Sequence, residues 1–187
     1  MEAVNPKYLI ALGVVITLVM LLRVINPHRS YSTDAYWQDA TIEKVHKVPA
    51  AALEPGNKNG SVLMWAAMNV SDPSLLAALV ERGADVNESD PVFTGTPLSS
   101  AAAYSKYPEV IDELIRLGAD INQLVSNGED SLMVAAQYNV NEGIIERLIH
   151  HGADPTRINA QSKTALDLAR AKKNTVAEAA LQKYESH

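Results

Sequence analysis

The 187-residue chain contains no cysteine, and its aromatic content is only 5%, with a single phenylalanine. The lack of cysteine excludes disulfide bonds and metal sites built from thiolates, and it fits either side of a membrane. The sequence also lacks any run of basic residues, and its formal net charge is −6. Nucleic acid is therefore not expected as a partner, because affinity for a phosphate backbone comes from lysine and arginine.

Local motifs of common active sites are missing as well. No glycine-rich phosphate-binding loop and no serine in a nucleophile elbow is present. His150 and His151 are adjacent, so a helix would point them in different directions, and no carboxylate pair or His-x-x-x-His spacing accompanies them. We interpret the two histidines as a solvated helix end. We expect no catalytic residue, no metal, no cofactor and no small-molecule substrate.

What the chain does contain is a repeated segment. Gly-Ala-Asp begins at Gly83, Gly118 and Gly152, at intervals of 35 and 34 residues. Each copy follows a helix start that carries two alanines: Ala66-Ala67, Ala101-Ala102 and Ala135-Ala136. A fourth copy, residues 163–169, has no closing Gly-Ala-Asp of its own. A period in this range is typical of a solenoid of stacked units, and solenoids mostly bind other macromolecules.

The residue chemistry supports stacked helix pairs. Thr96 can cap a helix, and Pro97 fits the first helical position, where no backbone donor is lost. Apolar residues at helical spacing, such as Val110, Ile111 and Leu114, predict a buried stripe. The repeated glycines fall where second helices end, a place where a left-handed conformation is common.

The repeat resembles the ankyrin repeat, whose pattern is roughly Gly-x-Thr-Pro-Leu-His-x-Ala-Ala, a second helix and then Gly-Ala-Asp-Val-Asn. The resemblance covers about residues 57–184 and is best in Thr96-Pro97-Leu98, Ala101-Ala102 and Gly118-Ala119-Asp120-Ile121-Asn122. The chain departs from the family at the histidine position, which holds Met64, Ser99, Met133 and Asp167. The resemblance implies an all-α ankyrin-repeat solenoid of stacked helix-turn-helix units that binds another protein through its concave face.

The repeats define the expected organisation of the chain. We expect a short tail (1–7), a transmembrane helix (8–25), a linker (26–34), an N-terminal cap or half repeat (35–56), ankyrin repeats at 57–90, 91–125 and 126–159, and a fourth repeat with the C-terminal cap at 160–187. Within the N-terminal cap, residues 41–48 resemble a lone second helix, and Trp37 and Leu53 would cover the first repeat.

Residues 8–25 form a nearly continuous apolar run, interrupted by Arg23 near its end. Eighteen helical residues span about 27 Å, close to the hydrocarbon thickness of about 30 Å. We expect a single-pass anchor, in a bacterial inner membrane. A cleaved signal peptide is the alternative, although the nearest small-x-small site, at 33–35, lies well beyond the run. Flanking positive charges lean slightly towards a cytoplasmic solenoid, whereas the very short tail favours the periplasm.

In ankyrin proteins the concave face is formed by the inter-repeat turns and the exposed edge of the first helices. The resemblance therefore implies a set of partner-binding residues: Met68, Asn69, Phe93, Tyr104, Ser126, Asn127, Glu129, Gln137, Tyr138, Lys163 and Lys172. Tyr104 and Tyr138 share one register near Phe93 and would form an aromatic stripe; alternatively, they pad the stack. Trp65 occupies a slot that is usually packed between repeats, so we expect it in the core.

These features favour a membrane-anchored module that binds a partner protein and has no enzymatic activity of its own. Two alternatives stay open. The chain could be an immunity or inhibitor protein that blocks a toxin or effector enzyme. It could also be a non-catalytic subunit of a membrane complex.

Overall fold

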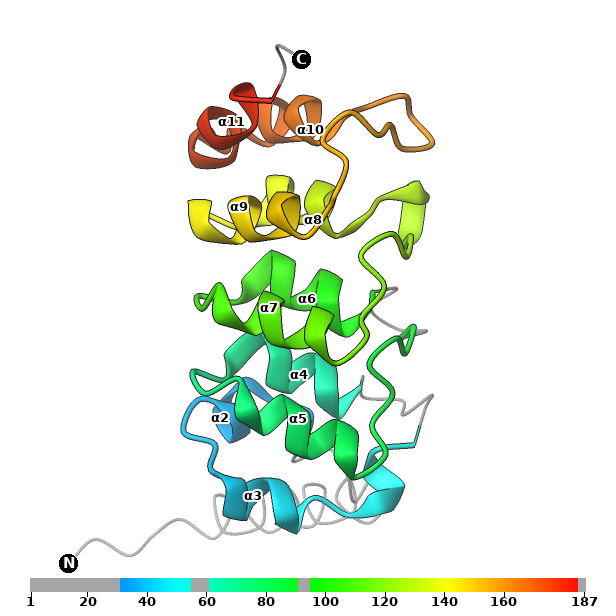
Figure 1. The fold of residues 1–187 in the computed structure, drawn as a ribbon, viewed down its shortest axis with the longest axis vertical. Coiled ribbons are helices and arrows are strands. Elements are labelled where there is room, and N and C mark those ends of the chain that lie inside the picture. Colours follow the sequence, from blue (N-terminus) through cyan, green and yellow to red (C-terminus); the bar gives the residue numbers. More distant parts are fainter. Residues whose placement is uncertain (1–30, 55–60, 91–94, 185–187) are drawn as a thin grey trace, which may run out of the picture.

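The computed structural model describes residues 31–54, 61–90 and 95–184, and all statements below refer to these ranges. Their α-helices pair into stacked units, and no strand lies within them (Figure 1). The N-terminal unit is followed by four repeats: α2 (Asp34–Trp37) with α3 (Ile42–Lys47), α4 (Val62–Asn69) with α5 (Ser74–Glu81), α6 (Pro97–Tyr104) with α7 (Glu109–Arg116), α8 (Ser131–Tyr138) with α9 (Glu142–His150), and α10 (Ala165–Lys172) with α11 (Thr175–Gln182). Short 3-10 helices at Ala50–Ala52 and Ser126–Gly128 lie in the connections.

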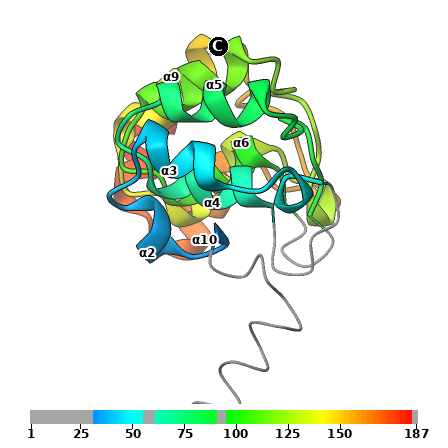
Figure 2. The same ribbon diagram turned by 90° about the horizontal axis from the view of Figure 1, so that it is seen from below.

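The helices form two layers that run along the stack. The first helices pack in series, α2 on α4, α4 on α6, α6 on α8 and α8 on α10. The second helices do the same, from α3 through α5, α7 and α9 to α11. Figure 2, which looks along the stack, shows α5 and α9 on one side and α4, α6 and α10 on the other. The expected all-α stack of helix-turn-helix units is thus confirmed.

The first helices begin with side-chain caps. Ser61, Thr96, Asp130 and Thr164 each accept a hydrogen bond from the backbone N–H three residues further on, at 2.9–3.4 Å. Pro97 occupies the first turn of α6, as its fixed φ and missing donor favour. These contacts satisfy amide groups that a helix start otherwise leaves unpaired.

The second helices of the first three repeats end in the same turn. Gly83, Gly118 and Gly152 have φ values of 103°, 101° and 97°, a region that residues with a Cβ rarely adopt. In the second repeat, Ala119 N–H then donates to the Leu114 carbonyl at 2.9 Å, which closes the helix end. The repeated Gly-Ala-Asp segments are therefore corners of the scaffold.

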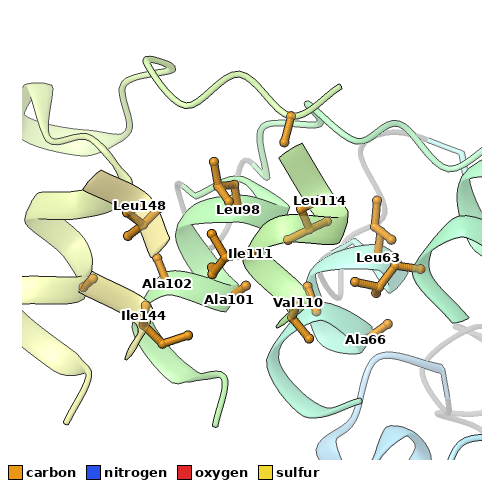
Figure 3. Close-up of a cluster of buried hydrophobic side chains, with 14 of the residues drawn as sticks. Leu63, Ala66, Leu98, Ala101, Ala102, Val110, Ile111, Leu114, Ile144 and Leu148 are labelled. Atoms are coloured by element: carbon orange, nitrogen blue, oxygen red, sulfur yellow. The ribbon is translucent and has the colours of Figure 1, made fainter. Parts of the chain in front are cut away.

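The core lies between the two layers and continues from repeat to repeat (Figure 3). Ala101 and Ala102 are fully buried, and their small side chains let α6 lie close to α4 and α8. Val110, Ile111 and Leu114 supply the buried stripe of α7, as the helical spacing predicts. Since each unit buries its apolar surface against its neighbours, the stability of any one unit depends on the next.

The N-terminal unit contains more structure than the sequence indicates. Residues 26–34 are expected to form a linker, yet α2 begins at Asp34, and Trp37 Nε1 donates to the Tyr31 carbonyl at 2.7 Å. The unit also has a short first helix, α2, where only a second helix is expected. Trp37 and Leu53 are buried, because α2 packs on α4 and α3 packs on α5.

No helix of the described ranges is both long enough and apolar enough to cross a bilayer. The expected membrane helix, residues 8–25, lies outside the described residues, as does Phe93.

Candidate partner-binding groove

A groove runs over the first helices of the first three repeats and encloses a volume of about 670 Å³. Its lining comes from α4, α6 and α8, from the start of α2, and from the connection that precedes α8. The described lining residues are Asp34, Met64, Trp65, Met68, Asn69, Gly95, Ser99, Ser100, Ala103, Tyr104, Val125, Ser126, Asn127, Glu129, Val134 and Tyr138.

One register of the first helices contributes three lining residues to this groove, Asn69, Tyr104 and Tyr138. Asn69, Tyr104, Tyr138 and Lys172 are the last residues of α4, α6, α8 and α10, and we call them the end-of-helix strip. The rings of Tyr104 and Tyr138 lie 6.3 Å apart between centroids, with their planes inclined by 33°. Lys172 Nζ lies 5.2 Å from the centroid of the Tyr138 ring, within cation–π range. Tyr104, Tyr138 and Lys172, which differ between otherwise similar repeats, are thus neighbours in space.

The two tyrosines of the strip are exposed. Tyr104 retains 59% and Tyr138 retains 48% of its accessible surface. Side chains that only fill space between repeats are buried in this stack, as Leu98 and Leu132 are. A large part of each ring is therefore available to another molecule.

Trp65 is expected in the core, and its side chain is in part there. It is partly buried and packs against the hydrophobic core, and it also lines the groove, as Met68 does. On the same helix, Leu63, Ala66 and Ala67 are fully buried. Trp65 therefore adds an aromatic surface to the groove.

The turn before α8 brings three predicted residues to the groove. Ser126 and Asn127 belong to the short 3-10 helix, where Asn127 has a φ of 63°, a value that asparagine tolerates better than most residues. Glu129 follows, and its Oε2 accepts from Gln137 Nε2 at 2.8 Å. Gln137 itself does not line the groove; it positions Glu129.

The carboxyl group next to Glu129 has a structural role. Asp130 is buried, caps α8 through the N–H of Met133 at 2.9 Å, and lies 3.7 Å from Arg157 Nε. Burial raises the pKa of Asp130 despite these partners. Glu129 is therefore the carboxylate of this turn that faces the groove.

The remaining predicted residues lie elsewhere. Lys163 is exposed and does not line the groove, and Lys172 reaches it only through its contact with Tyr138. Sequence reasoning missed Met64 and Ser99, which line the groove at the position of the family's histidine. Their shared position in the repeat could have indicated them from the sequence. Nothing in the sequence indicated Asp34, because it precedes the recognisable repeats.

His151 is not simply a solvated helix end, as the sequence suggested. Its Nε2 lies 2.8 Å from Asp112 Oδ1 of the preceding repeat, and Arg147 pairs with the other oxygen of the same carboxylate. His150 is exposed. Because α7 and α9 are second helices, this cluster lies away from the groove-lining residues. No group of three or more His, Asp and Glu side chains in the described ranges could hold a metal ion.

Comparison with known proteins agrees with the helical-repeat architecture. A family model described as ankyrin repeats (3 copies) matches residues 63–159 and 98–185. The chain belongs to the ankyrin-repeat family. Members of this family are generally modules for protein–protein interaction.

Individual relatives are similar over part of the chain. Ankyrin repeat and SOCS box protein 6 of Mus musculus is 35% identical over 91 residues, which cover 48% of this chain and 22% of that protein. A putative ankyrin repeat-containing protein of Treponema pallidum is 34% identical, over 44% of this chain and 28% of its own length. Alpha-latrotoxin-Lg1a of Latrodectus geometricus is 31% identical, over 60% of this chain and 8% of the toxin. The chain spans less than a third of each of these proteins.

Proposed function

We propose that this protein is a non-catalytic module that binds a partner protein in the groove over α4, α6 and α8, and that residues 8–25 hold it at a membrane. Partner binding accords with the family, whose members are generally interaction modules. The groove supplies what such a contact needs, an apolar surface with a few polar groups at its edge.

The observation that carries the proposal is the exposed pair Tyr104 and Tyr138 beside the groove. An exposed aromatic ring gains free energy when a partner covers it and removes its apolar surface from water. Tyrosine is also enriched among the residues that dominate the binding energy of interfaces. Trp65 and Met68 extend the same surface towards α4. Together these residues offer apolar contact area, and the two tyrosines add hydroxyl groups that can form hydrogen bonds.

Membrane attachment is supported by the apolar run at 8–25. Such a run has the length that a bilayer requires. A tether would raise the effective concentration of the module for any partner on the same membrane, so that moderate affinity in the groove would suffice.

Capture of a partner by the full chain tests the groove. Wild-type protein and the double variant Tyr104→Ala/Tyr138→Ala would be affinity-purified from membranes and the bound proteins identified by mass spectrometry. Each tyrosine change should weaken capture by about tenfold or more, the effect expected of a residue that dominates an interface.

Tyr107→Ala is the matched control. Tyr107 is also an exposed tyrosine, but it lies outside the groove lining. It should leave capture unchanged. Equal capture by all variants would reject the groove as the binding surface, provided that circular dichroism shows the same thermal unfolding.

Membrane attachment is tested separately. We expect the full chain to stay in the membrane fraction after carbonate extraction, and a variant that lacks residues 8–25 to be released. Protease digestion of spheroplasts and of sealed vesicles would then show which side carries the repeats. Release of the full chain by carbonate would refute the anchor without affecting the groove.

A further inference from the structure

The charged side chains that line the groove in the described ranges are of one sign, and Lys172 lies nearby, over the Tyr138 ring. Among its described lining residues, Asp34 and Glu129 are the charged side chains, and both are acidic. They come from opposite ends of the groove, since Asp34 begins α2 and Glu129 precedes α8. The inference that follows rests on the proposed function and specifies the chemistry of the partner.

Neither carboxylate is neutralised within the described structure. Asp34 Oδ1 accepts from Asn69 Nδ2 at 2.9 Å. Glu129 accepts from Gln137 Nε2 at 2.8 Å and from Asn159 Nδ2 at 3.4 Å. All three donors are neutral amides, which orient a carboxylate but leave its charge uncompensated.

Several carboxylates elsewhere in the described structure have a cationic partner. The pairs are Asp39 with Lys44, Glu43 with Lys47, Asp112 with Arg147, Glu113 with Arg116, Asp130 with Arg157, Glu178 with Arg170, and Glu142 and Glu146 with Lys183. Other carboxylates of the described surface, such as Glu54 and Glu109, also form no ion pair there, so what distinguishes Asp34 and Glu129 is their place in the groove lining. The net charge of −6 adds a field that attracts a basic segment.

The aromatic rings of the end-of-helix strip provide a second recognition element for cations. Lys172 Nζ already lies over the Tyr138 ring, which shows that this strip accepts a positive charge. Tyr104 is exposed, and its ring has no cation over it in the described structure. A guanidinium suits such a site better than an ammonium, because it is planar, stacks on aromatic faces and pairs with a carboxylate through two hydrogen bonds.

We propose that the groove binds a segment of its partner protein that carries an arginine, whose guanidinium stacks on Tyr104 and pairs with Asp34 or Glu129. Apolar side chains of the same segment contact Trp65, Met64 and Met68. The hydroxyl group of Ser126, which is exposed in the groove lining, is in reach of its backbone.

Selection from a random peptide library displayed on phage tests this chemistry without knowledge of the partner. The full chain in detergent would be the bait. Peptides enriched on wild type should contain arginine next to apolar residues. Enrichment of acidic or purely apolar peptides, or no enrichment, would overturn the proposal.

Two sets of substitutions sharpen the test. Replacing the arginine of a selected peptide by citrulline keeps its shape and removes its charge, and should weaken binding by about tenfold or more, whereas lysine should cause a smaller loss. Asp34→Asn/Glu129→Gln should cause a similar loss and remove most of the salt dependence. Glu54→Gln/Glu109→Gln makes the same charge change outside the groove and should have little effect on peptide affinity. If both double variants lose the same affinity, the attraction depends only on the net charge of the protein, and the proposal is overturned.

The two proposals fail differently. If Tyr104→Ala/Tyr138→Ala abolishes partner capture while Asp34→Asn/Glu129→Gln leaves it unchanged, the groove binds a partner but the arginine proposal is wrong. If none of these variants alters capture, both are wrong.

Discussion

Asn174 donates its side-chain amide to the backbone oxygen of Asn139 at 2.6 Å, which joins the fourth repeat directly to the third. The same amide donates to the Ala136 carbonyl at 3.1 Å. One repeat earlier, Asn139 Nδ2 donates to the carbonyls of Ala102 and Ser105 at 2.9 and 3.0 Å. Both side chains are buried, and each satisfies carbonyls at the end of the preceding first helix, which otherwise lack partners.

Asn139→Ala should therefore reduce the stability of the stack. The change leaves the buried carbonyls of Ala102 and Ser105 without a donor, which costs about 1–3 kcal/mol. Urea unfolding followed by circular dichroism measures the loss. Asn122→Ala is the control, because Asn122 is exposed and makes a single side-chain contact with Arg157; it should change stability by less than about 0.5 kcal/mol. Similar losses of unfolding free energy in both variants would show that the buried hydrogen bonds of Asn139 add no more stability than an exposed contact.

Asp112 should couple two repeats electrostatically. It pairs with Arg147 and His151 of the next repeat, and all three side chains are partly exposed. A double-mutant cycle with Asp112→Ala and Arg147→Ala should give a coupling energy of about 0.5–1 kcal/mol. The coupling should fall in about 1 M salt, because screening shortens the range of the attraction. A coupling near zero at low salt would mean that the pair contributes nothing measurable.

Gly143→Ala should destabilise the protein although alanine favours helices. Gly143 lies in the first turn of α9, and a Cβ at this position would come within 2.9 Å of Pro108 Cγ in the preceding repeat. Overpacking against a rigid ring costs about 1–3 kcal/mol, which exceeds the gain of about 1 kcal/mol in helix propensity. Thermal unfolding of Gly143→Ala should show the loss, and adding Pro108→Ala should recover part of it. A more stable Gly143→Ala protein would refute the close approach.

The stability that Asp167 contributes should depend on pH. The pKa of this carboxyl is lowered, mainly because it accepts from the Thr164 backbone N–H at 3.1 Å in the capping box of α10. A group with a lowered folded-state pKa stabilises above its unfolded value of about 3.9, and this contribution is lost as the pH falls through the folded value. The difference in Tm between wild type and Asp167→Asn should therefore be largest near neutral pH and narrow towards pH about 3. A constant difference would show that charge is not involved.

Most of the fold could be predicted because the same local signals recur in every repeat, and each repeat packs on the next. Gly118 marks a turn through its φ, Pro97 marks a helix start, and Ala101-Ala102 marks a close helix contact. Each of these signals depends on the residue itself and on its immediate neighbours. The stack then follows, since every unit packs only on adjacent units.

The candidate site was less predictable, because its residues depend on contacts between units. Tyr104 and Tyr138 could be placed in one register from the sequence, and their separation of 6.3 Å agrees with that placement. Trp65 lies both against the core and in the groove, a division that helical spacing alone does not predict. Asp34 precedes the recognisable repeats, and the Asp112–His151 contact depends on side-chain geometry that the order of the helices does not fix.

The asparagine bridges also have a mechanical meaning. They connect the second repeat to the third and the third to the fourth, whereas at the equivalent position of the second repeat the hydroxyl of Ser105 contacts Tyr107 of its own unit, and the first repeat has Val70 there. Between the first two repeats, hydrogen bonds come instead from Asn87 in the turn, which contacts Gly118, Asp120 and Gln123. The ends of α6 and α8, which carry Tyr104 and Tyr138, are thus held together by a buried amide, whereas in the described structure the ends of α4 and α6 meet without such a bridge.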